Sequence, residues 1–145
     1  MHRYFSLTLV LIQFGCIGML AWFSEGALSR GAPLFYIVFG MILGVWAIIV
    51  MRKSKLHITP EVDRHAELVM DGPYRLIRHP MYTSVLLVCL GLLLASTSQN
   101  ALFVYLLLVF NLVIKLYYEE SMLKKKFRQY REYMKKTKRL LPYIY

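Results

Sequence analysis

The sequence predicts an all-α, polytopic membrane protein with four transmembrane helices and a C-terminal amphipathic helix. Composition is the first observation behind this prediction. The chain has 145 residues, of which 58% are hydrophobic, and its mean hydropathy is +0.48, whereas a soluble domain is roughly 45–50% apolar. The other two observations are the arrangement of the apolar residues in long blocks and the position of the charged residues around those blocks.

The apolar blocks set the predicted spans, because a membrane-spanning helix needs about 20 apolar residues. The first two blocks are long enough and carry no charge, and the last two reach that length if the helix continues for a few residues beyond each block. The first block has no clear small-residue cleavage site, so we interpret it as a span and not as a signal peptide. We predict one domain, residues 1–145, with spans at residues 4–23, 34–51, 81–97 and 101–118.

The net charge of +10 is unevenly distributed and predicts the orientation. Residues 24–33 hold one base and one acid, and residues 97–100 hold no charge. Residues 124–139 hold nine bases. The bases between the second and third blocks are Arg52, Lys53, Lys55, Arg64, Arg75 and Arg78. The positive-inside rule therefore predicts an inner or plasma membrane protein with both termini and the loop of residues 52–80 in the cytoplasm.

The basic residues flank the predicted spans, where they would meet anionic lipid head groups. We therefore predict membrane lipid as a partner and no nucleic acid. Cys16 and Cys89 lie inside apolar blocks and are interpreted as small buried hydrophobes. No set of His, Cys, Asp and Glu has zinc-like spacing, so the sequence predicts no metal site.

Polar and aromatic residues are concentrated in the stretch GPYRLIRHPMY, from Gly72 to Tyr82. Pro80 suits the first turn of the third helix, where its missing N–H is not needed. Arg78 and His79 would then lie at a helix N-terminus, where unpaired N–H groups attract anions. Ionisable residues at a membrane helix mark a functional-site hypothesis.

Two adjacent glutamates, Glu119 and Glu120, follow the fourth apolar block. Adjacent helical positions point about 100° apart, so we expect at most one of them to face a pocket directly. The other would order Arg75, Arg78 or the basic tail. A carboxylate at this position would suit a cationic cofactor.

The tail of residues 119–145 contains the predicted amphipathic helix. Apolar residues at spacings of four, three and four mark one helical face: Leu123, Phe127, Tyr130 and Met134. The basic residues lie mostly off this face, as is typical of a helix on the membrane surface. Folded back over the bundle, this helix would form a lid.

Together these motifs resemble the isoprenylcysteine carboxyl methyltransferase family of integral membrane enzymes, above all its short prokaryotic members. The family shows a Gly-Pro-Tyr-Arg turn, an Arg-His-Pro-x-Tyr step into a helix, a Glu-Glu pair and a terminal pattern. Here these are Gly72-Pro73-Tyr74-Arg75, Arg78-His79-Pro80-Met81-Tyr82 and Glu119-Glu120, then Leu123, Phe127, Tyr130, Tyr133, Arg139 and Pro142. Ser84, Arg128 and Lys138 depart from two glycines and a proline that are usual in the family.

The resemblance implies a methyltransferase that depends on S-adenosylmethionine and acts on a lipophilic acceptor from the bilayer. That acceptor would be an isoprenylcysteine-like carboxylate, or another small or lipid thiol, amine or carboxylate. The resemblance implies Arg78, His79 and Glu120 as catalytic residues. It implies a cofactor site formed by Val69, Gly72, Tyr74, Arg78, His79, Tyr82, Glu119 and Glu120.

Two other interpretations stay open at this point. One is a relative of the membrane sterol reductases, which share a similar motif region and bind NADPH; it would need more anion-binding groups and a longer chain. The other is a non-catalytic membrane scaffold in which the motif only packs. The identity of the acceptor and the oligomeric state are also left open.

Overall fold

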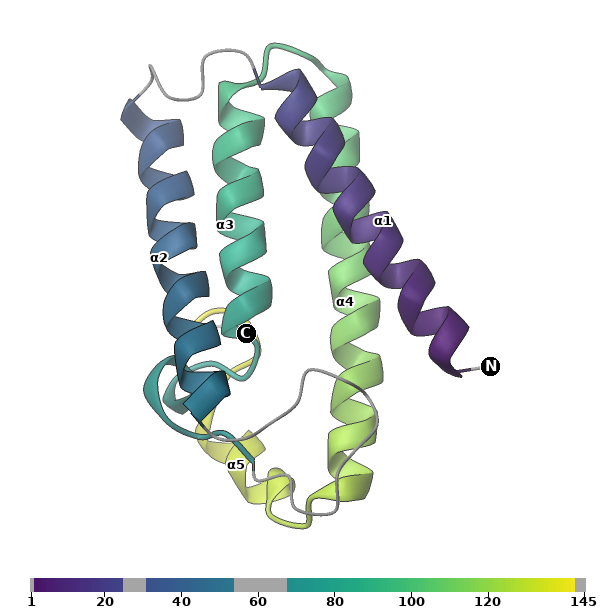
Figure 1. Cartoon of the computed structure of the whole chain (residues 1–145), viewed down its shortest axis with the longest axis vertical. Coiled ribbons are helices and arrows are strands. Elements are labelled where there is room, and N and C mark those ends of the chain that lie inside the picture. Colours follow the sequence, from purple (N-terminus) through teal and green to yellow (C-terminus); the bar gives the residue numbers. More distant parts are fainter. Residues whose placement is uncertain (1, 25–30, 54–67, 143–145) are drawn as a thin grey trace.

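The computed structural model describes residues 2–24, 31–53 and 68–142, which form a bundle of long helices (Figure 1). The elements are α1 (His2–Phe23), α2 (Gly31–Lys53), the 3-10 helix η2 (Gly72–Arg75), α3 (Pro80–Ala95), α4 (Asn100–Lys126) and α5 (Tyr130–Lys136). The described residues form no β-strand and only two isolated bridges. The prediction of an all-α fold is therefore confirmed.

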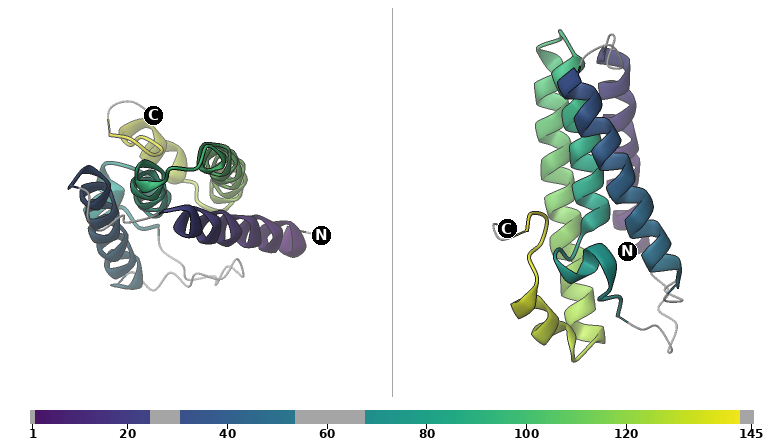
Figure 2. Two further views of the ribbon diagram at one scale, coloured as in Figure 1. Left: turned by 90° about the horizontal axis from the view of Figure 1, so that it is seen from above. Right: turned by 90° about the vertical axis from the view of Figure 1, so that its left-hand side faces the viewer.

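The four long helices alternate in direction along the chain (Figure 1). Helix α3 is central, because it packs against α1, α2 and α4, while α2 packs mainly on α3 and α1 mainly on α4. Short helices η2 and α5 lie at the end of the bundle where α2 and α4 finish and α3 begins (Figures 1 and 2). This arrangement gathers both sequence motifs at one end of the molecule.

Three helices in the described part of the chain are long and apolar enough to cross a membrane, namely α1, α2 and α4. Helix α3 is equally apolar but has only 16 residues, which is about 24 Å at 1.5 Å per residue. That length is short of the ~30 Å hydrocarbon core. The predicted third span, residues 81–97, is thus present as an apolar helix of less than spanning length.

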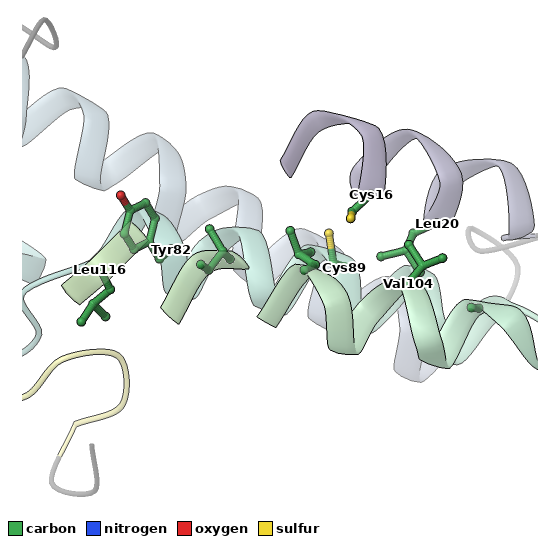
Figure 3. Close-up of a cluster of buried hydrophobic side chains, with 9 residues drawn as sticks. Cys16, Leu20, Tyr82, Cys89, Val104 and Leu116 are labelled. Atoms are coloured by element: carbon green, nitrogen blue, oxygen red, sulfur yellow. The ribbon is translucent and has the colours of Figure 1, made fainter. Parts of the chain in front are cut away.

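The core of the bundle is formed by α1, α3 and α4 (Figure 3). Cys16 and Leu20 from α1 meet Cys89 from α3 and Val104 from α4. Both cysteines are free, and their burial agrees with the prediction. Tyr82 belongs to the same cluster, and Figure 3 shows it at one end of the group. The core therefore runs directly into the sequence motif.

Glycines allow α2 and α3 to approach closely. A Cβ atom at Gly40 would lie 2.9 Å from both the Ser84 carbonyl oxygen and the Val88 backbone nitrogen. The Ser84 hydroxyl donates a hydrogen bond of 2.7 Å to the Gly40 carbonyl. Serine at this position, where the family usually has glycine, is therefore accommodated by a bond across the helix interface.

Two helix ends differ from the ends of the predicted spans. Helix α3 ends at Ala95 and not at Thr97, because Ser96 adopts an extended backbone and its hydroxyl accepts a bond of 3.1 Å from the Ser98 N–H. Such local side-chain bonds compete with helix. Helix α4 continues to Lys126, eight residues past the predicted end at Tyr118.

The single amphipathic helix predicted for the tail is not confirmed. Phe127 is extended, with φ −109° and ψ 112°, and divides the tail into the end of α4 and the seven-residue helix α5. The reversal buries Tyr130 and Tyr133 against the bundle, where they are 1% and 7% exposed. Burial of two aromatic rings outweighs continuation of the helix, since each ring removes a large apolar area from water.

Of the basic residues predicted between the second and third spans, Lys55 and Arg64 lie outside the described residues.

Candidate active site

A cavity of about 390 Å³ lies at the end of the bundle that holds the sequence motifs. Its walls come from the start of α1, the end of α2, the residues before α3, the start of α3, the second half of α4 and α5. Small-molecule sites have volumes of roughly 300–1,000 Å³ and mostly apolar walls with a few polar groups. The cavity meets both criteria and is the candidate active site.

Gly72 and Tyr74 belong to η2, which lies beside α2, and Tyr74 lines the cavity. Gly72 has φ +57°, a left-handed conformation that glycine adopts without steric cost. A Cβ atom there would lie 2.8 Å from Val50 Cγ2, so glycine also permits close packing on α2. Tyr74 follows in η2 and is buried. Burial, together with the nearby Glu119 carboxylate, raises the pKa of Tyr74 to about 12, so this phenol stays neutral at physiological pH.

Residues 137–140, which we name the C-terminal strap, run alongside the motif before α3. The Arg78 N–H donates to the Lys138 carbonyl at 2.8 Å, and the Lys138 N–H donates to the Leu76 carbonyl at 3.2 Å. The Thr83 hydroxyl in α3 donates to the Leu140 carbonyl at 2.7 Å. The strap is therefore joined to the residues before α3, and to α3 itself, by hydrogen bonds to its backbone. Lys138 supplies one of them through an N–H that proline would lack.

Arg78 and Glu120 form a buried ion pair. Arg78 Nε lies 2.8 Å from Glu120 Oε1, and the two side chains are 7% and 1% exposed. Arg78 Nη1 donates to the carbonyls of Met134, at 3.2 Å, and of Thr137. Arg139 Nε lies 3.4 Å from the other carboxylate oxygen, Oε2. Glu120 thus holds two arginines, and Arg78 joins α4 to the C-terminal strap.

Glu119 faces the cavity instead, with 41% of its side chain exposed. The Tyr82 hydroxyl donates a short hydrogen bond to Glu119 Oε1. The His79 ring stacks on Tyr82 with centroids 5.3 Å apart and an angle of 3° between the planes. His79 Nδ1 is 3.9 Å from Glu119 Oε2, and His79 Nε2 is 3.7 Å from Glu120 Oε1. The imidazole therefore lies between the two carboxylates.

Six of the eight residues assigned to the site by resemblance line the cavity: Val69, Tyr74, Arg78, His79, Tyr82 and Glu119. Two of the eight do not. Gly72 packs against α2, and Glu120 lies behind Arg78. Arg75 is exposed and away from the cavity wall. The expectation that only one of the adjacent glutamates faces the pocket thus agrees with the geometry.

Sequence reasoning missed several residues of the cavity wall. Tyr130 and Tyr133 were noted in the tail but were not assigned to the site, and burial raises the pKa of both phenols. Lys115, Tyr118 and Lys126 from α4 also line the cavity. A signal for Lys115 was present in the sequence, because it stands four residues before Glu119 and therefore on the same helical face.

Most of the chain matches the model of a known family. The family model described as phospholipid methyltransferase matches residues 29–130. The chain belongs to this family. The matched residues include Gly72–Tyr82 and the Glu119–Glu120 pair, whereas the C-terminal strap lies beyond them.

A curated relative supports the resemblance stated from the sequence. Over 114 residues the chain is 30% identical to protein-S-isoprenylcysteine O-methyltransferase B of Arabidopsis thaliana. The aligned region is 77% of this chain and 58% of the relative. The chain thus spans less than two thirds of the length of that curated relative. No solved structure matches the chain significantly.

Proposed function

We propose that this chain is an integral-membrane methyltransferase that uses S-adenosylmethionine and acts on a lipophilic acceptor. The single observation that supports this most is the cavity with a partly exposed carboxylate, Glu119, at the boundary of the apolar bundle. Family membership and the name of the Arabidopsis relative indicate the class of reaction.

The cavity fits this cofactor by the chemistry of its side chains. S-adenosylmethionine supplies a methyl group on a cationic sulfonium centre. A carboxylate and aromatic rings both stabilise a cation, and the cavity wall holds Glu119 beside Tyr74, Tyr82, Tyr118 and Tyr130. Glu119 would bind the cationic part of the cofactor, and the aromatic rings would contact its apolar surface.

The ion pair and the hydrogen bonds around the cavity wall would keep the site rigid. Glu120 fixes Arg78, and Arg78 holds the C-terminal strap against the start of α3. Tyr82 fixes the Glu119 carboxylate by its hydrogen bond. Methyl transfer depends mainly on in-line approach of the acceptor, so a wall that positions both reactants contributes more than proton transfer. In this proposal Arg78 and Glu120 are positioning residues.

The acceptor in this proposal comes from the bilayer, because three flanking helices are long enough to span it. An isoprenylcysteine-like carboxylate and a phospholipid head group are both compatible with the family. The cavity end of the bundle carries the basic residues of α4 and α5, whereas the turn between α3 and α4 carries no charge. By the positive-inside rule we place the cavity at the cytoplasmic face.

Calorimetric titration of the detergent-purified chain with S-adenosylhomocysteine tests the proposal, with NADPH titrated in parallel. We expect saturable binding of S-adenosylhomocysteine alone. Binding of NADPH alone would favour the reductase interpretation. If a folded sample binds neither S-adenosylhomocysteine nor NADPH, the proposed function is refuted.

A further inference from the structure

Lys115 is a charged residue in the apolar part of α4. It stands eleven residues before the helix ends at Lys126, which is about 16 Å along the axis at 1.5 Å per residue. A charged side chain inside a membrane span is costly, and such residues face a cavity or the bundle interior and mark ligand pathways. Lys115 lines the cavity.

The contacts of Lys115 do not neutralise its charge. Its Nζ atom donates a hydrogen bond of 3.3 Å to Gln13 Oε1 of α1 and lies 5.2 Å from the centroid of the Tyr82 ring. Within residues 2–24, 31–53 and 68–142, no carboxylate forms an ion pair with this ammonium. An ammonium has three N–H donors, so Lys115 retains capacity to bind an anion.

The position of Lys115 distinguishes it from the cofactor-binding groups. Glu119 stands one helical turn further toward the end of α4, about 6 Å along the axis. Lys115 is therefore deeper in the apolar part of the bundle than Glu119. A water-soluble cofactor enters from the aqueous end, whereas an amphiphile enters from the bilayer, so the deeper position favours contact with the amphiphile.

We propose that Lys115, held by Gln13, is the specificity-determining residue that binds the anionic head group, a carboxylate or a phosphate, of an amphiphilic methyl acceptor. This inference rests on the proposed function. A protonated amine head group is disfavoured at the same place, because like charges at short range repel in a low-dielectric site. Lys115 thus selects for anionic acceptors and against cationic ones.

The test compares three amphiphiles that share one chain: oleate, oleyl phosphate and oleyl alcohol. Their dissociation constants are measured on the full chain in a neutral detergent for wild type, Lys115→Met and Lys115→Arg. Lys124→Met is the matched control, since Lys124 lies on the same helix but is exposed and does not line the cavity. Affinity for S-adenosylhomocysteine is measured in every sample.

We expect wild type to bind at least one of the two anions roughly tenfold or more tightly than oleyl alcohol, as a charge-assisted hydrogen bond would give. Lys115→Met should lose this preference, whereas Lys115→Arg and Lys124→Met should keep it. The preferred anion distinguishes a carboxylate acceptor from a phosphate. Binding of S-adenosylhomocysteine should not change in Lys115→Met.

Equal affinity of wild type for the anions and for oleyl alcohol would overturn the inference, even if Lys115→Met did not fold. Unchanged anion preference in Lys115→Met would also overturn it. Loss of S-adenosylhomocysteine binding in Lys115→Met would assign the lysine to the cofactor instead. Failure of wild type to bind S-adenosylhomocysteine would refute the proposed function, while the anion preference would still be measured separately.

Discussion

Adjacent glutamates with opposite surroundings provide the sharpest test of the site. Glu120 is 1% exposed and paired with Arg78, whereas the Glu119 side chain is 41% exposed and faces the cavity. Substitution by glutamine removes one negative charge at either position and keeps the shape. Glu120→Gln should therefore destabilise the fold, and Glu119→Gln should weaken ligand binding with little effect on stability.

The magnitude for Glu120 follows from the bonds that it makes. A hydrogen bond to a charged group contributes about 1.5–3 kcal/mol, and Glu120 bonds Arg78 Nε at 2.8 Å with Arg139 Nε further away at 3.4 Å. Loss of the carboxylate charge leaves Arg78 buried without a counter-ion. We expect a loss of about 2 kcal/mol, which corresponds to a decrease in melting temperature of roughly 4–8 °C for a chain of this size.

Two buried thiols make the assay straightforward. Cys16 and Cys89 are free, and they are 4% and 1% exposed. A maleimide dye that fluoresces on reaction with thiols therefore reports unfolding without an engineered cysteine. The same samples are titrated with S-adenosylhomocysteine, so stability and binding are compared for both variants.

Equal melting temperatures of wild type and Glu120→Gln would refute the assignment of Glu120 as the buried partner of Arg78. If Glu119→Gln binds S-adenosylhomocysteine with the affinity of wild type, Glu119 is not part of the cofactor site. Destabilisation by Glu119→Gln only, with Glu120→Gln as stable as wild type, would show that the faces of α4 that meet the cavity and Arg78 are assigned to the wrong glutamates.

Three further perturbations test the fold around the site. Gly40→Ala should lower the free energy of unfolding by about 1–2 kcal/mol through overpacking against α3, although alanine favours helix. The control Gly18→Ala should be neutral or stabilising, because no neighbouring atom lies within 4 Å of a Cβ at that position. Equal melting temperatures of the two variants would contradict the close packing of α2 on α3. Thr83→Val should lower the melting temperature by roughly 2–4 °C, because the hydrogen bond to the Leu140 carbonyl contributes about 1 kcal/mol. The same variant should speed proteolysis of the tail. Unchanged proteolysis would show that this bond does not hold the strap. The pKa of Tyr74 is raised from 10.0 to about 12, so its contribution to stability is present below pH 10 and is lost as pH rises toward 12. Tyr74→Phe should reduce this alkaline loss, measured by tryptophan fluorescence, and an identical pH profile would count against the burial of Tyr74.

The local elements of this protein follow from its sequence. Long uncharged blocks predict helices, because a backbone in an apolar environment must satisfy its own hydrogen bonds. Pro80 marks the start of α3, where the structure begins that helix. Cys16 and Cys89 lie within apolar blocks, so the sequence predicts small buried hydrophobes, and both are buried. These features depend on a few adjacent residues, so a linear pattern is sufficient to predict them.

The tertiary structure decides how these elements are paired and which side chains meet. The chain turns at Phe127 because Tyr130 and Tyr133 pack against residues that are far away in the sequence and become buried there. The Tyr133 hydroxyl, for example, donates a hydrogen bond of 2.5 Å to the Tyr74 carbonyl. Residues 78 and 120 are paired across 42 positions. Glu119 and Glu120 have the same side chain, and their roles differ only because positions 100° apart on α4 face a cavity and an arginine. Local patterns carry no information on such contacts, since the helix faces are assigned by packing.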